Sequence, residues 1–187
     1  MTSNEISDIL LKEFYPKGRN YCTTNFTGCG LHECDVIMVT ESYMVYEYEI
    51  KCSYQDFKAD FKKQDKHNKL SGSYYKNPIV SPYKNIIHDE QWYLKHTGTT
   101  GRPNYFYYVS EPKVIPLEQV PEYAGLIHII DNKPQIIKKA KKLHKYKCTF
   151  ELISQICRNL TAKMIYGCSF MNYKSSTNKN NNSLNVI

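Results

Sequence analysis

The sequence predicts an α/β fold in which a β-sheet packs against helices in a single domain. Its 187 residues match the usual size of one domain, ~100 to 200 residues, and are enough to bury a hydrophobic core. Segments in which apolar side chains alternate with polar ones, as in strands, are interleaved with segments in which apolar side chains recur every three or four residues, as in helices. We expect the domain to span residues 1–171, with an insertion at about 67–104, and a disordered tail rich in Asn, Ser and Lys at 172–187.

The chain is predicted to begin with a helix over residues 2–14. Its apolar side chains have helical spacing, and Thr2 and Glu5 match a capping box, in which each side chain bonds the backbone of the other residue. Strands are then predicted at 21–28 and at 36–39, the second of which is a short apolar run.

The run 43–52 has the clearest strand pattern. Its even positions are apolar from Met44 onward, whereas Glu47, Glu49 and Lys51 occupy odd positions. Because side chains alternate between the two faces of a strand, these three charged groups share one face, and the opposite face is buried. One interpretation is an exposed face whose charges are simply solvated. The other is a functional site that uses them.

A helix is predicted directly after this strand. Ser53 is expected to be its N-cap, with Asp56 three residues further on. Four lysines follow on the same segment: Lys58, Lys62, Lys63 and Lys66. They either contact a phosphate backbone or form a solvated helix face.

The second half of the chain contains three further predicted strands and one long helix. The strands are expected at 105–109, 126–130 and 135–137. The helix begins at about Thr149, and its apolar stripe consists of Leu152, Ile153, Ile156, Leu160 and Met164.

Positive charge is concentrated at the C-terminal end of the chain. The sequence has 25 Lys and Arg against 18 Asp and Glu, a net charge of +7, and residues 132–187 contain 11 of the basic residues but one acid. A run of lysines without acids favours a polyanionic partner such as a phosphate backbone. The lysines predicted to contact nucleic acid in this run are Lys138, Lys139, Lys141 and Lys142. The alternative is a soluble linker.

Several classes of protein are disfavoured by the sequence. No apolar stretch approaches the ~20 residues that span a bilayer, and the N-terminus lacks a signal-peptide pattern. We therefore expect a cytoplasmic protein without a membrane partner. The seven cysteines are odd in number and contain no C-x-x-C pair, which argues against a disulfide scaffold and against a zinc ribbon.

The two strands that precede and follow residues 41–43 can form a hairpin with a three-residue loop. Thr40 then faces Met44, and continuing the same register places Asp35 opposite Glu49. Directly opposed residues have Cβ atoms ~4.5 to 5.5 Å apart, which is close enough for two carboxylates to share one hard cation.

This predicted pair of carboxylates is suited to binding a metal ion. Two carboxylates held so close repel each other unless a cation neutralises them, and Mg²⁺ or Mn²⁺ prefers oxygen ligands. The backbone carbonyl of Ile50 could complete the coordination by Asp35 and Glu49. Lys51, on the same face as Glu49, could hold or deprotonate an attacking water while the metal polarises a scissile phosphate. The pattern therefore predicts phosphodiester hydrolysis, with Asp35, Glu49 and Lys51 as the catalytic residues.

These residues and their neighbours resemble the PD-(D/E)XK nuclease superfamily, and most closely its MmcB-like DNA-repair and phage-encoded branch. The segments that carry the resemblance are 32–35, 49–53, 56–61, 105–112 and 121–127. The match covers about residues 1–166, apart from 67–104. The resemblance implies a central mixed sheet flanked by helices, as in a restriction-endonuclease-like core. It also implies that Asp35 and Glu49 bind the metal and that Lys51 is the catalytic lysine.

Two details of the family pattern differ or stay open in this chain. Cys34 stands where a proline usually precedes the first acid. Many of these families also use an acidic residue on the first helix, and here that residue is either Glu5 or Glu13.

The sequence thus predicts a Mg²⁺- or Mn²⁺-dependent nuclease that hydrolyses DNA, in DNA repair or in phage DNA metabolism, with RNA as an alternative substrate. A second hypothesis is a catalytically inactive module on the same fold that binds nucleic acid or another protein, because a fold does not determine an activity.

Overall fold

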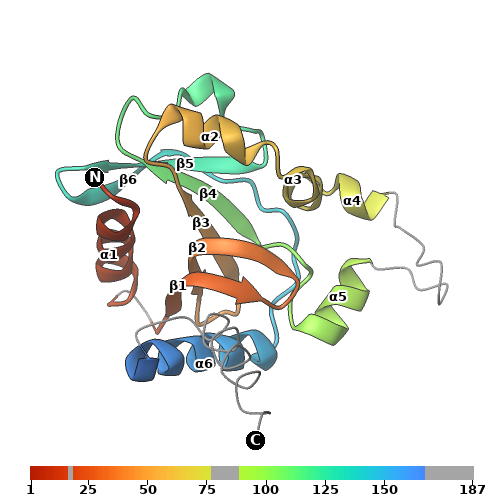
Figure 1. The fold of residues 1–187 in the computed structure, drawn as a ribbon. Coiled ribbons are helices and arrows are strands. Elements are labelled where there is room, and N and C mark those ends of the chain that lie inside the picture. The colour runs from red at the N-terminus through yellow and green to blue at the C-terminus, as the bar shows by residue number, and fades with distance from the viewer. Residues whose placement is uncertain (17–18, 77–88, 167–187) are drawn as a thin grey trace, which may run out of the picture.

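Six strands form a single sheet in the part of the chain that the computed structural model describes, which is residues 1–16, 19–76 and 89–166 (Figure 1). The strands lie in sequence order across the sheet: β1 (Tyr21–Gly28), β2 (Leu31–Val39), β3 (Val45–Ile50), β4 (Tyr105–Ser110), β5 (Ala124–Ile130) and β6 (Lys133–Lys138). The pairs β3–β4 and β4–β5 are parallel, and the other three pairs are antiparallel. The sheet is therefore mixed, which confirms the predicted fold class.

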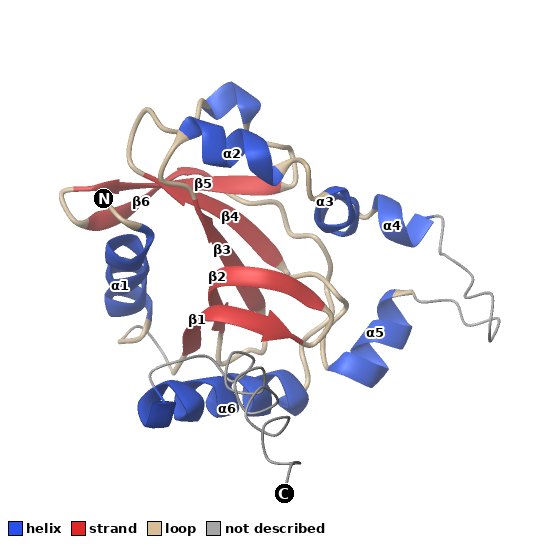
Figure 2. Ribbon diagram, viewed as in Figure 1, coloured by secondary structure: helices blue, strands red, loops and turns tan. Residues whose placement is uncertain are grey.

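Helices cover both faces of this sheet (Figure 2). They are α1 (Ser3–Phe14), α2 (Tyr54–Asp60), α3 (Gln64–Ser71), α4 (Ser73–Lys76), α5 (Glu90–Thr97) and α6 (Phe150–Tyr166), with a 3₁₀ turn, η1 (Leu117–Gln119), before β5. α1 packs on one face. On the other face, α6 packs against β1, β2 and β3, while α2 and α3 pack against β4 and β5. None of the described helices is both long enough and apolar enough to cross a membrane.

The hairpin between β2 and β3 has the register predicted from the sequence. Val36 pairs with Tyr48, and at the loop the Thr40 amide donates to the Met44 carbonyl at 3.0 Å. β2 begins earlier than predicted, because its first residues pair with β1. Asp35 therefore lies within a strand rather than at the start of one. The prediction of a short strand was wrong because this pairing depends on a separate segment of the chain.

Both predicted helix caps are confirmed. Thr2 and Glu5 form the capping box, and the Asp56 amide donates to the Ser53 hydroxyl at 3.1 Å. The helix after Ser53 is shorter than predicted, because α2 ends and α3 begins after a short turn. The four lysines predicted for one helix are consequently divided between α2, the turn and α3.

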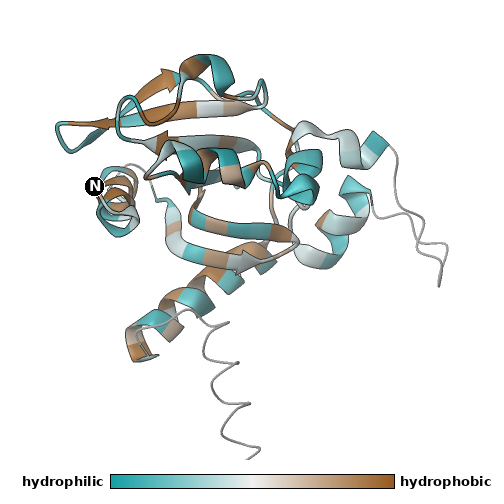
Figure 3. Cartoon of the chain, turned by 45° about the horizontal axis from the view of Figure 1, so that its top comes forward, coloured by the Kyte–Doolittle hydropathy of each residue, from teal (hydrophilic) through white to brown (hydrophobic). Residues whose placement is uncertain are grey.

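α6 buries only the first half of its predicted apolar stripe. Leu152, Ile153 and Ile156 are buried, whereas Leu160 and Met164 are 40% and 88% exposed. Hydrophobic and hydrophilic bands alternate along this helix (Figure 3). In its second half the buried residues are instead Asn159 and Ala162, which lie outside the predicted stripe.

The region predicted as an insertion, 67–104, is mostly helical up to Thr97 where the structure describes it, and residues 98–104 form an irregular segment before β4. It contains most of α3 and all of α4 and α5. The Arg102 guanidinium donates from Nε to Glu90 at 3.1 Å, and the Lys69 ammonium lies 4.9 Å from the centre of the Tyr93 ring. The tail predicted at 172–187 lies outside the described residues.

Asn104 joins three segments at the start of β4. Its side chain is fully buried, and its Oδ1 accepts a hydrogen bond from the Val45 amide at 2.7 Å. Its Nδ2 donates to the carbonyls of Tyr146, at 2.8 Å, and His144, at 3.1 Å. Asn104 thereby holds the basic segment before α6 against the sheet.

Replacing Asn104 by alanine should destabilise the protein by roughly 2 to 4 kcal/mol, because several buried backbone groups lose their partner. The free energy of unfolding in urea measures this loss. Asn4→Ala, at an exposed position on α1, is the matched control and should leave stability nearly unchanged. Equal stability of the two variants would contradict the role given to Asn104.

Candidate active site

Asp35 meets the backbone of β3 at the point where β2 and β3 separate. The paired ladder ends at Val36 and Tyr48, one step before the predicted pair of Asp35 and Glu49. Beyond it, Asp35 Oδ2 accepts a hydrogen bond from the Ile50 amide at 2.7 Å. A side chain thus replaces the next backbone contact between the strands. It places the Asp35 carboxylate beside the segment that carries the other predicted residues.

The environment of Asp35 disfavours its charged form. Burial, and then the negative charge of Glu49, raise the pKa of Asp35 to about 6, although the Ile50 amide, Lys51 and Lys66 act in the opposite direction. The repulsion predicted between the two carboxylates is therefore present in this fold.

Glu49 and Lys51 are buried together on the inner face of β3. Their side chains are 5% and 4% exposed, and Lys51 Nζ lies 2.9 Å from Glu49 Oε1. The same ammonium lies 3.4 Å from Asp60 and 3.6 Å from Asp56, both on α2. The interpretation of this strand face as merely solvated is wrong, because α2 and α3 cover it.

Two buried charged residues that the sequence reading did not assign to the site belong to this cluster, Lys66 and Asp60. The more exposed Lys63 also reaches it, with its ammonium 3.3 Å from Asp60 Oδ1 and 3.7 Å from Glu49 Oε1. Lys66, on α3, places its ammonium 2.8 Å from Glu49 Oε2 and 3.5 Å from Asp60 Oδ1. Asp60 also accepts a hydrogen bond from the Tyr108 hydroxyl at 3.0 Å. Burial by itself would raise the pKa of Asp60, but Lys66, Lys51 and the Tyr108 hydroxyl lower it well below its ordinary value.

Lys66 is therefore neither a solvated lysine nor an available phosphate contact, since it is 1% exposed. The sequence contained no signal for this, because a spacing of six residues between Asp60 and Lys66 places them on different sides of one continuous helix. The turn between α2 and α3 brings them together instead.

Glu47 lies on the same strand face and is also buried. Its Oε1 has no hydrogen-bond partner among the described residues. Burial, with a smaller contribution from Glu49, raises the pKa of Glu47 to about 8 in spite of the opposing charge of Lys66. Glu47 is therefore protonated at neutral pH, unlike Asp60.

The predicted DNA-contacting lysines differ in how free their ammonium groups are. Lys58 and Lys62 are exposed on and just after α2. In the basic run, Lys138 donates to the Val120 and Pro121 carbonyls at 2.9 and 2.8 Å, and Lys141 pairs with Glu122 at 2.7 Å. The two remaining predicted lysines of this run, Lys139 and Lys142, are exposed.

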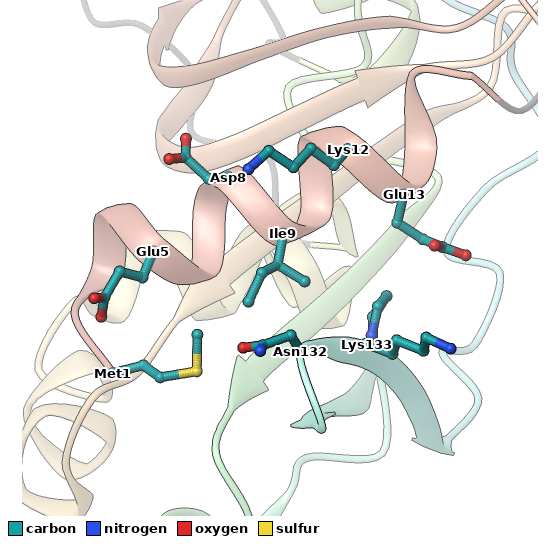
Figure 4. A pocket seen from close by; sticks show the side chains of 9 residues that line it. Met1, Glu5, Asp8, Ile9, Lys12, Glu13, Asn132 and Lys133 are labelled. Carbon is teal, nitrogen blue, oxygen red and sulfur yellow. The ribbon is translucent and has the colours of Figure 1, made fainter.

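The two candidate acids of the first helix lie by a separate hollow. Glu5 and Glu13 line a space of about 620 Å³ between α1 and the β5–β6 turn, where Lys133 also lies (Figure 4). Glu5 is part of the helix cap, because it accepts the Thr2 amide at 2.7 Å. α1 packs against the face of the sheet opposite to the Glu49 side chain. The structure therefore does not bring these acids to the predicted site.

The described residues contain no group of three or more His, Cys, Asp and Glu side chains arranged to hold a metal ion. The Asp35 carboxylate is partly exposed, and its Oδ2 accepts the Ile50 amide. Glu49 offers the same carboxylate oxygens that Lys51 and Lys66 contact. Burial, and after it the charge of Glu49, raise the pKa of Asp35, so a cation beside Asp35 would relieve the part that is due to repulsion.

No family model matches the chain, and no curated protein matches it. Among solved structures, a protein of unknown function from Silicibacter pomeroyi is similar, with a TM-score of 0.57 and 14% sequence identity. The similarity covers 88% of this chain and 92% of that one. At this level of identity the likeness shows the fold, and it supports the α/β architecture described above.

Glu47→Gln should change how stability depends on pH. Folded Glu47 keeps its proton up to a pH of about 8, whereas its ordinary pKa is 4.5. The folded state binds more protons in this interval, so the wild type should lose stability relative to Glu47→Gln as pH rises, by at most about 1.4 kcal/mol per pH unit. Urea denaturation between pH 5 and pH 8 measures the difference.

Glu33→Gln is the matched control for this experiment, because Glu33 is exposed on β2. Its stability should follow that of the wild type across the pH range. A Glu47→Gln curve parallel to the wild-type curve would mean that Glu47 is not held neutral.

Proposed function

We propose that the protein is a metal-dependent nuclease that hydrolyses phosphodiester bonds in DNA, with DNA repair or phage DNA metabolism as its setting. The observation that carries this proposal is the hydrogen bond from the Ile50 amide to Asp35. It brings the first acid to the segment that carries Glu49 and Lys51, as the sequence pattern requires of a shared site. The motifs that resemble PD-(D/E)XK nucleases support the same activity.

Asp35, Glu49 and the Ile50 carbonyl would hold Mg²⁺ or Mn²⁺. Such an ion, when bound, polarises a phosphate oxygen and stabilises the charge that develops during hydrolysis. The carboxylate of Asp35 suits this role because repulsion from Glu49 is only partly neutralised by the nearby lysines.

Lys51 is proposed to orient the attacking water by donating hydrogen bonds to it. Burial by itself would lower the pKa of Lys51, but Glu49 and the two acids of α2 raise it above its ordinary value. A lysine that keeps its proton is a poor general base. Of the two roles predicted from the sequence, holding the water is therefore favoured over deprotonating it.

Four exposed lysines are the best candidates to contact the DNA backbone: Lys58, Lys62, Lys139 and Lys142. Contacts of this kind neutralise phosphates and position the duplex without reading its sequence. Lys138 and Lys141 are less suitable, because their ammonium groups already have partners within the protein.

One observation favours the second hypothesis, an inactive module that binds nucleic acid or protein. Lys51 and Lys66 each contact one oxygen of Glu49, so this carboxylate is neutralised without a metal. Under that hypothesis the charges stabilise the fold and serve no reaction.

A cleavage assay separates the two hypotheses. Asp35→Asn should abolish cleavage of labelled DNA, and Lys51→Met, which keeps most of the buried volume, should reduce the rate by about 100-fold or more while sparing most of the DNA affinity. The assay should compare one duplex and one single strand, with and without Mn²⁺. Lys12→Ala, an exposed lysine of α1, is the control.

Absence of cleavage by the wild type on both substrates with Mn²⁺ would favour the inactive module. Cleavage that continues at the wild-type rate in Asp35→Asn would indicate a different active site or a contaminating nuclease.

The salt dependence of DNA binding tests the exposed lysines of the basic run. Replacing Lys139 and Lys142 together by alanine should weaken binding about equally for all sequences. It should also reduce the slope of log affinity against log salt by up to about 2, since each neutralised phosphate contributes ~0.9. Lys12→Ala with Lys133→Ala, two exposed lysines by the α1 hollow, is the matched control. An unchanged slope in the first variant would assign the run to a linker.

A further inference from the structure

Lys66 has an unusual position for a lysine, because its charged end is fully enclosed. The residue is 1% exposed, and its ammonium lies between two carboxylates from different elements, 2.8 Å from Glu49 on β3 and 3.5 Å from Asp60 on α2. It also lies 5.1 Å from the centre of the Phe106 ring. Lysines are rarely buried unless paired, so these partners explain why the side chain stays inside.

Two acids meet the Lys66 ammonium at ion-pair distance, Glu49 and Asp60. A buried charge is stabilised when opposite charges meet it at such a distance. The chain itself therefore supplies a positive charge inside the cluster.

The Lys66 ammonium contacts a carboxylate oxygen of Glu49 that a second metal ion would need as a ligand. In sites with two metals the ions lie ~3.5 to 4 Å apart, and carboxylates neutralise both. Here Glu49 Oε1 lies 2.9 Å from Lys51, and Glu49 Oε2 lies 2.8 Å from Lys66. Asp60 Oδ1 is shared by Lys66, Lys51 and Lys63, at 3.5, 3.4 and 3.3 Å. A divalent cation at Oε2 would have to displace a buried ammonium.

We propose that the Lys66 ammonium is a built-in cation, which occupies the position between Glu49 Oε2 and Asp60 and excludes a divalent ion from it. The number of metal ions rests on the proposed function. With that function, the site takes one divalent ion, next to Asp35, and not two. Lys66 itself is 1% exposed and acts through Glu49 and Asp60.

Binding of Mn²⁺ to the purified full chain, followed by electron paramagnetic resonance of the free ion, tests this proposal. The wild type should bind one Mn²⁺ per chain. Lys66→Met removes the charge and retains the side-chain volume, so it should bind a second Mn²⁺ or bind the first at least about tenfold more tightly, because repulsion between cations is removed.

Lys69→Met is the matched control. Lys69 lies on the same helix and is half-buried, but its ammonium donates to the Gly30 carbonyl and contacts neither acid of the cluster. Its Mn²⁺ binding should equal that of the wild type. Lys66→Gln, which can still donate a hydrogen bond to Glu49, replaces Lys66→Met if circular dichroism shows that the methionine variant does not fold.

The outcomes distinguish this inference from the proposed function. The inference would be overturned, and the nuclease proposal left intact, if the wild type and the folded Lys66 variant each bind one Mn²⁺ with equal affinity. The same would follow if the wild type binds two Mn²⁺. Binding by the Lys66 variant alone would support the built-in cation and contradict a metal-dependent activity. Absence of Mn²⁺ binding in every variant would overturn both.

Discussion

The contact of two buried lysine ammonium groups, those of Lys51 and Lys66, with one buried carboxylate, Glu49, is the constraint on which the surrounding structure depends. Buried charges are costly unless opposite charges meet them at close range. Lys51 comes from the end of β3, while Lys66 and Asp60 come from α3 and α2. The two helices and the turn between them must therefore hold a fixed position over the sheet, and their apolar residues pack there against β4 and β5.

β2 and β3 separate from each other beside this cluster. Where the ladder ends, a carboxylate rather than a carbonyl accepts the amide of Ile50. Asp35 thus lies within hydrogen-bonding distance of the strand and stays partly exposed, while Glu49 is enclosed. The two acids differ accordingly: the repulsion that Asp35 feels from Glu49 is only partly offset, whereas Glu49 contacts lysine ammonium groups directly. Under the proposed function, this asymmetry favours an external cation on the Asp35 side of the cluster.

The lysines have two different roles in this fold. The lysines that touch the cluster stabilise buried acids, whereas exposed lysines on α2 and in the segment before α6 remain available for a polyanion. Asn104 links the basic segment before α6 to the sheet, because it bonds both β3 and that segment. The proposed substrate contacts and the proposed catalytic residues are therefore parts of one packed unit in the described chain.

The sequence by itself determined the features that depend on neighbouring residues. The two helix caps, the β2–β3 register and the shared face of Glu47, Glu49 and Lys51 all follow from short-range periodicity and spacing, and the structure has them. Only the tertiary structure decided that this face is buried and that Lys66 reaches Glu49. Those contacts join β3 to α2 and α3, and they depend on where α2 ends and on how α3 packs. The alternation of side chains along one strand contains no information about which elements cover that strand.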